Sequence, residues 1–163
     1  MYQRILLAVD GSVAGESALR EAVELASTHK GTIRVLHVIA MPCSDASPGD
    51  QAVREEFLGT LMVMGTKIVR HAIDTIRSHG VAAEAVMVEL GKRSVADEII
   101  AQAHQWGASV IVLGTHPLGI DARVGANTRE VLANSTVPVL SINAEGRRVS
   151  TRSCAEGELA VAK

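Results

Sequence analysis

Residues 4–29 read RILLAVDGSVAGESALREAVELASTH, and this stretch decides the class of fold. The run RILLAV at 4–9 is almost continuously apolar, which is typical of a strand buried in a parallel sheet. Asp10-Gly11-Ser12 then interrupts the run, and Ser12 can cap a helix over about 13–29. One face of that helix is apolar and consists of Leu19, Ala22, Val23 and Ala26. The stretch therefore predicts a buried strand followed by a helix that packs on the sheet.

The same order of an apolar run and an amphipathic stretch continues along the chain. We expect strands at 4–9, 32–40, 83–90, 109–114 and 137–143, and helices at 13–29, 51–79, 94–106 and 124–134. Alternating strands and helices form right-handed βαβ units, whose parallel sheet is covered by helices on both faces. The predicted fold class is α/β, a three-layer α/β/α domain with a five-stranded parallel sheet over residues 1–143.

Two further segments complete this prediction. The long helix at 51–79 would turn an apolar face inward, made of Leu58, Leu61, Met62, Gly65, Ile68, Val69, Ala72, Ile73 and Ile76. Residues 144–163 show no sustained periodicity, so we expect a mobile C-terminal tail there.

Composition argues against several classes of function. Aromatic residues make up 2% of the chain, which leaves little with which to stack the bases of a single-stranded nucleic acid. A net charge of −2 without a long like-charged block gives no support for binding nucleic acid or a membrane surface. Cys43 and Cys154 lack the spacing of a metal site or a disulfide framework. No apolar run is long enough to span a membrane and no signal-peptide pattern is present, so we expect a cytoplasmic protein.

Unusual residues follow two of the predicted strands. Asp10-Gly11-Ser12 ends the first strand, and Gly114-Thr115-His116 ends the fourth. In doubly wound sheets, ligands bind beyond the carboxyl ends of the strands, where the strand order reverses. If the first and fourth strands are neighbours at that point, the two loops face each other across one crevice.

Four segments follow one another along the chain: ILLAVDGS at 5–12, LHVI at 36–39, VIVLGTH at 110–116 and VPVLSI at 137–142. In this order they resemble the universal stress protein family. The resemblance extends over residues 1–143 and implies the adenine nucleotide alpha hydrolase-like fold, a parallel sheet in the order 3-2-1-4-5. It also implies a stress-response protein that binds an adenine nucleotide, ATP or AMP, where strands one and four meet. Mg²⁺ would accompany ATP, and a homodimer would form through strand five, Val137 to Ile142.

The resemblance also assigns roles to residues. Asp10 would lie near the ribose or adenine, and Val38 would offer its backbone to the adenine edge. Gly114 and the glycines after it would wrap the ribose and phosphates, and the first turn of the last helix would offer N–H groups to phosphate. The full candidate set is Asp10, Val38, Gly114, Thr115, His116, Gly119, Arg123, Gly125, Ala126, Asn127 and Thr128.

The loop between Gly114 and Thr128 departs from the pattern of the nucleotide-binding members. Either the loop is two residues shorter than that pattern, or Asn127 replaces its final glycine. Pro117 has no N–H for a phosphate, whereas Arg123 could supply a charged partner in its place. A dimer of the same fold that binds no nucleotide and acts through protein–protein contacts therefore remains the alternative.

An enzyme is the third hypothesis, and the sequence favours it least. An adenylating protein of related architecture would need an SGGxDS-like loop or a second acidic cluster, and neither occurs. Hydrolysis of ATP would be slow at most, because no general base or Walker lysine is recognisable. His116 would contact a ligand phosphate rather than act in catalysis, and His37 would be a hydrogen-bonded histidine within a strand.

Overall fold

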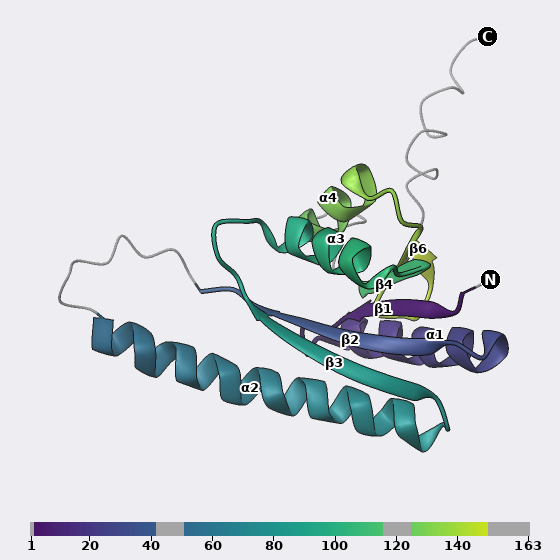
Figure 1. Cartoon of the computed structure of the whole chain (residues 1–163), viewed down its shortest axis with the longest axis horizontal. Helices are drawn as coiled ribbons and strands as arrows, with labels where there is room; N and C mark the ends of the chain where they lie inside the picture. The colour runs from purple at the N-terminus through teal and green to yellow at the C-terminus, as the bar shows by residue number, and fades with distance from the viewer. Residues whose placement is uncertain (1, 42–50, 116–124, 150–163) are drawn as a thin grey trace, which may run out of the picture.

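The computed structural model describes residues 2–41, 51–115 and 125–149, and its elements follow the predicted alternation (Figure 1). Ser12 and Ser94 cap α1 and α3 as their sequence contexts favour, since each hydroxyl accepts a backbone N–H of the first turn. In chain order the elements are β1 (Arg4–Ala8), α1 (Val13–His29), β2 (Thr32–Ile39), α2 (Gln51–Ser78), β3 (Ala82–Glu89), α3 (Val95–Trp106), β4 (Val110–Gly114), α4 (Ala126–Asn134), β5 (Val139–Ile142) and β6 (Arg148–Val149).

The strands form one sheet in the order β3-β2-β1-β4-β5-β6. The pairings from β3 through β5 are parallel, in agreement with the predicted α/β fold. β1 lies between β2 and β4, with Ala8 opposite both Leu36 and Leu113. The point where the strand order reverses is therefore at β1 and β4, as expected.

The predicted five-stranded parallel sheet is present, and the structure extends it by one further strand at an edge. β6 pairs antiparallel with β5, Ser141 opposite Val149 and Ile142 opposite Arg148. A turn at Gly146, which has a φ of 75°, reverses the chain, and Arg148 forms an ion pair with Glu21 of α1. Residues 144–149, assigned from sequence to the C-terminal tail, thus form this turn and strand, and the rest of the tail lies outside the described residues.

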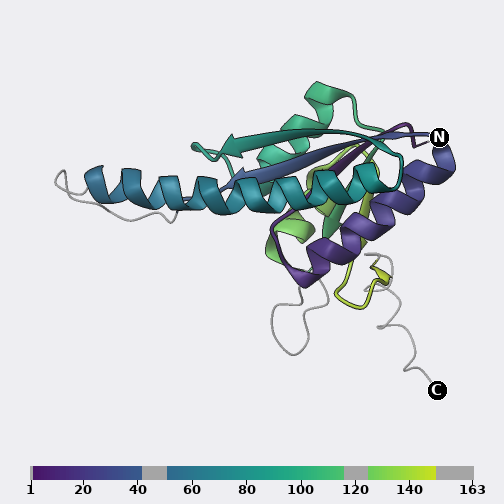
Figure 2. The same cartoon turned by 90° about the horizontal axis from the view of Figure 1, so that it is seen from below.

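The helices cover both faces of the sheet. α1 and α2 lie on one face, and α3 and α4 lie on the other (Figures 1 and 2). β1 shows how the strands divide their side chains, because Ile5 and Leu7 pack toward α1 and α2, whereas Leu6 packs toward α3. No helix among the described residues is long and apolar enough to cross a membrane.

Only part of the inward face predicted for α2 is buried. Gly65, Val69, Ala72, Ile73 and Ile76 are buried, all in the C-terminal half of the helix. The N-terminal half extends past the end of the sheet (Figure 2), and there Met62 is 49% exposed while Leu58 and Leu61 are half-buried. Helical periodicity places these residues on one side of α2, but the sheet beneath ends before it reaches them.

Candidate functional site

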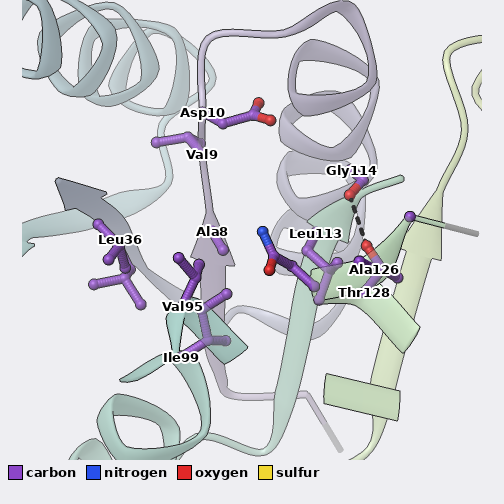
Figure 3. A pocket seen from close by; sticks show the side chains of 13 residues that line it. Ala8, Val9, Asp10, Leu36, Val95, Ile99, Leu113, Gly114, Ala126 and Thr128 are labelled. Atoms are coloured by element: carbon purple, nitrogen blue, oxygen red, sulfur yellow. Dashed lines mark hydrogen bonds between the residues drawn. The ribbon is translucent and has the colours of Figure 1, made fainter. Parts of the chain in front are cut away.

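A cavity of about 290 Å³ lies on the α3 and α4 face of the sheet, beyond the ends of β1 and β4 (Figure 3). Its lining is mostly apolar at the floor and consists of backbone and small side chains at the mouth. The lining residues are Ala8, Val9, Asp10, Leu36, Val38, Val95, Ile99, Leu113, Gly114, Gly125, Ala126, Asn127 and Thr128. Asp10 at the end of β1 and Gly114 at the end of β4 therefore border one cavity, and residues 116–124 of the predicted second loop lie outside the described residues.

One wall of the cavity is the edge of β2 that β1 leaves uncovered. The carbonyl of Leu36 accepts the N–H of Val9 at 2.9 Å, so the backbone of Leu36 faces β1. Backbone groups two residues apart along a strand face the same side, and those of Val38 therefore face this side as well. Because β1 ends at Ala8, Val38 presents an N–H and a C=O beside the cavity, the donor–acceptor pair that the edge of a purine base needs.

The first turn of α4 forms the opposite wall. Its cap residue, Gly125, has no side chain with which to satisfy the N–H groups of that turn, unlike Ser12 of α1 and Ser94 of α3. The start of the helix is fixed from β4 instead. Thr115 Oγ1 accepts the N–H of Gly125 at 3.1 Å, and Thr128 Oγ1 donates to the carbonyl of Gly114 at 3.3 Å. The uncapped N–H groups of α4 are thus held in place beside the cavity.

Asp10 lies at the end of β1 with its carboxylate at the mouth of the cavity (Figure 3). Its Oδ1 accepts the N–H of Ser12 at 3.0 Å, and Ser12 Oγ in turn accepts the N–H of Gly15 at 3.0 Å. The carboxylate therefore orders the turn that leads into α1.

Gly114 allows β4 to run close against α1. A Cβ at this position would lie 2.6 Å from the backbone carbon of Ala14 and 2.6 Å from the backbone nitrogen of Gly15. Both neighbours are backbone atoms, which cannot rotate away, so glycine is required here for packing whether or not a ligand binds.

Most of the candidate residues from the sequence line this cavity. They are Asp10, Val38, Gly114, Gly125, Ala126, Asn127 and Thr128. Thr115 does not line it, since its side chain is buried and supports Gly125 from behind. His116, Gly119 and Arg123 lie outside the described residues. His37 is a hydrogen-bonded strand histidine as predicted, with Nδ1 donating to the carbonyl of Val9 at 2.8 Å.

The sequence analysis missed the apolar lining. Val95 and Ile99 of α3 were not considered as site residues, nor were Ala8, Val9, Leu36 and Leu113. The sequence did contain a signal for Val95 and Ile99. They lie four residues apart directly after the cap Ser94, and the start of a helix that follows β3 lies at the carboxyl edge of a parallel sheet.

The sequence model that describes the universal stress protein family matches residues 1–143 of this chain. The chain belongs to the universal stress protein family. It is 30% identical over 150 residues to universal stress protein YxiE of Bacillus subtilis, an alignment covering 87% of this chain and 99% of that protein. A solved family member from Burkholderia pseudomallei is 27% identical and superimposes with a TM-score of 0.72, covering 86% of this chain and 96% of that one.

Several solved members of the family contain adenine nucleotides. The universal stress protein of Archaeoglobus fulgidus in complex with dAMP is 24% identical, with a TM-score of 0.60 and coverage of 86% of this chain and 97% of that one. Two others, at 20% and 18% identity, were solved with cAMP and with AMP, the second from Arabidopsis thaliana. The three ligands share adenine, a pentose and one phosphate.

Proposed function

We propose that this chain is a cytoplasmic stress-response protein that binds an adenine nucleoside monophosphate in the cavity between β1, β4 and α4. The observation that supports this most strongly is the pairing of an apolar cavity of purine size with an uncapped helix start at its mouth. Binding would act by population shift, since a nucleotide held by both loops favours the conformation in which they face each other.

The base would occupy the apolar part of the cavity. The cavity volume is close to the lower limit of about 300–1,000 Å³ for small-ligand pockets, which is enough to hold a purine base. Leu36, Val95 and Ile99 would cover the faces of the base, while the backbone of Val38 would pair with its edge. The ribose would then lie at the mouth, near Asp10.

The phosphate would lie at the first turn of α4. N–H groups at a helix start attract anions, and the helix dipole adds about 0.3–1 kcal/mol at an exposed position. Donors of this kind offset part of the loss at Pro117, which has no N–H. The described lining contains one carboxylate, Asp10, and no lysine, so with ATP and Mg²⁺ we expect binding with at most slow hydrolysis.

Assembly as a homodimer along the β5 edge is a further part of the proposal. β6 pairs with Ser141 and Ile142 but, within the described residues, with no earlier part of β5. Val139 and Leu140 therefore offer a short length of edge to a second copy, continued by the outer side of β6. Sedimentation equilibrium tests this part, and a monomer throughout the micromolar range would refute it without affecting the nucleotide site.

Calorimetric titration with AMP tests the nucleotide site. Val95 and Val13 are matched positions, because each is the first residue of a helix after a serine cap, but only Val95 lines the cavity and Val13 is 68% exposed. We expect Val95→Trp to abolish AMP binding and Val13→Trp to leave it unchanged. Asp10→Asn keeps an acceptor for the Ser12 N–H and removes the negative charge, and we expect it to weaken AMP binding.

The opposite results would reject the site. Equal affinity of the Val95→Trp variant and the original chain would place any bound AMP elsewhere. No heat and no melting shift with AMP, cAMP or ATP would favour the alternative, a dimer that acts through protein contacts.

A further inference from the structure

A second cavity, of about 270 Å³, lies on the opposite face of the sheet from the first. It opens between α1 and α2, which cover that face together (Figure 2), at the end of β1. Its lining consists of Val9, Gly11, Ser12, Gly15, Glu16, Leu19, Lys67, Ile68, His71 and Ala72. Of the residues that the structure describes, Val9 alone lines both cavities, so the turn at the end of β1 separates them.

The floor of this second cavity is apolar. Val9, Leu19 and Ala72 belong to the hydrophobic core between the sheet and its helices, and Ile68 packs against that core. Protein interiors are packed closely, with few voids larger than a water molecule. A cavity of this volume is therefore much larger than an ordinary packing defect, which holds at most one or a few water molecules.

The rim is polar and carries charges of both signs. Glu16 contacts His71 across the gap between α1 and α2, a pair that is ionic only when the imidazole is protonated. Lys67, one turn before His71 on α2, has no ion-pair partner among the described residues. A ligand whose apolar body lies on the floor would thus meet an ammonium group at the mouth.

We propose that this cavity binds a small amphipathic carboxylate with an unbranched apolar chain, of the size of octanoate. The chain would lie on Leu19, Ile68 and Ala72, and the carboxylate would bind Lys67. Its volume is close to the lower limit of about 300–1,000 Å³ for small-ligand pockets, which excludes long acyl chains from complete burial. The proposal does not depend on nucleotide binding, because the two cavities lie on different faces of the sheet.

Octanoate itself is the probe for the first experiment. We expect saturable binding by calorimetry, and nuclear Overhauser contacts from its methylene protons to the methyl groups of Leu19 and Ile68. Each methylene added from butanoate to octanoate should tighten binding about fourfold, since burial of one methylene is worth that factor. Absence of those contacts, or an affinity independent of chain length, would overturn the proposal.

Matched variants test each part of the site. Lys67 and Arg70 are exposed cations on α2, and only Lys67 lines the cavity. Lys67→Gln should weaken octanoate binding about two- to fivefold, the usual range for an exposed charge pair, and Arg70→Gln should leave it unchanged. Equal effects of the two substitutions would overturn the role of Lys67.

Two further experiments use a variant whose side chain fills the cavity and a nucleotide that could compete with octanoate. Ala72→Leu places a larger side chain in the cavity and should abolish octanoate binding, while the contacts to Leu19 and Ile68 identify the site even if this variant folds poorly. Saturating AMP should leave octanoate bound. Displacement of octanoate by AMP would place the acid in the nucleotide cavity and overturn the proposal, whereas failure of AMP to bind would bear only on the proposed function.

Discussion

Replacement of Gly65 by alanine tests how closely α2 approaches β2, the strand whose edge borders the candidate site. A Cβ at Gly65 would lie 2.7 Å from Cδ2 and 2.9 Å from Nε2 of His37, and 3.0 Å from Cε of Met87. The Met87 methyl group can move at little cost. The His37 ring cannot, because its Nδ1 donates to the carbonyl of Val9 at 2.8 Å.

Two opposing effects set the size of the change. Alanine is better than glycine in a helix interior by about 0.8–1 kcal/mol. Overpacking of a well-packed site costs about 1–3 kcal/mol. We therefore expect Gly65→Ala to be neutral or to lower the free energy of unfolding by up to about 2 kcal/mol.

Gly59 on the same helix is the matched control, since a Cβ there meets no atom within 4 Å. Gly59→Ala should raise stability by about 0.8–1 kcal/mol through helix propensity alone. The two variants should thus differ by about 1–3 kcal/mol, the overpacking cost itself. At about 2–4 °C per kcal/mol for a chain of this length, the difference in Tm is easily measured.

Urea unfolding followed by the fluorescence of Trp106, the only tryptophan of the chain, gives the two free energies. The same variants should differ in AMP affinity, because pressure on His37 is transmitted to Val9, which lines the nucleotide cavity. Equal stabilisation by Gly65→Ala and Gly59→Ala would refute the close approach of α2 to β2.

Three further substitutions probe the other parts of the fold. Asn127→Asp adds a charge at the start of α4. It should keep or raise stability by about 0.3–1 kcal/mol but weaken AMP binding about fivefold or more by repulsion of the phosphate, less so in high salt. Gly31→Ala directs a Cβ to 2.6 Å from the carbonyl oxygen of Tyr2 and should lower Tm, whereas Gly91→Ala, with open space around it, should not. Arg148→Ala breaks the ion pair with Glu21. It should speed amide exchange in β6 while global stability falls by no more than about 1 kcal/mol.

The parallel core of the fold was predictable because its signals are local. Continuous apolar runs mark buried strands, and Ser12 and Ser94 mark helix starts within one residue of where α1 and α3 begin. β6 was not predictable, since a strand of two residues has no periodicity of its own. Its position depends on the turn at Gly146 and on an ion pair between positions 127 residues apart in the chain.

In the candidate site, too, the residues that could be predicted are those with a local signal in the sequence. Polar and glycine residues at strand ends, such as Asp10 and Gly114, were found because they interrupt apolar runs. The apolar lining was missed because Val95 and Ile99 look like ordinary core residues in sequence. Only the spatial arrangement shows that their side chains border an open cavity rather than a packed interface.

The end of β1 explains why a cavity lies on each face of the sheet at this point. The strand stops at Ala8, and the turn that follows is fixed to β2 by two hydrogen bonds, from the Val9 N–H to the Leu36 carbonyl and from the His37 ring to the Val9 carbonyl. β2 continues beyond this point, as does α2, so neither face of the sheet is filled above the turn. One opening is then bordered by an uncapped helix start, which favours a phosphate, and the other by Lys67, which favours a carboxylate. A central strand that stops before β2 does thus leaves an opening on each face of the sheet beside a single turn.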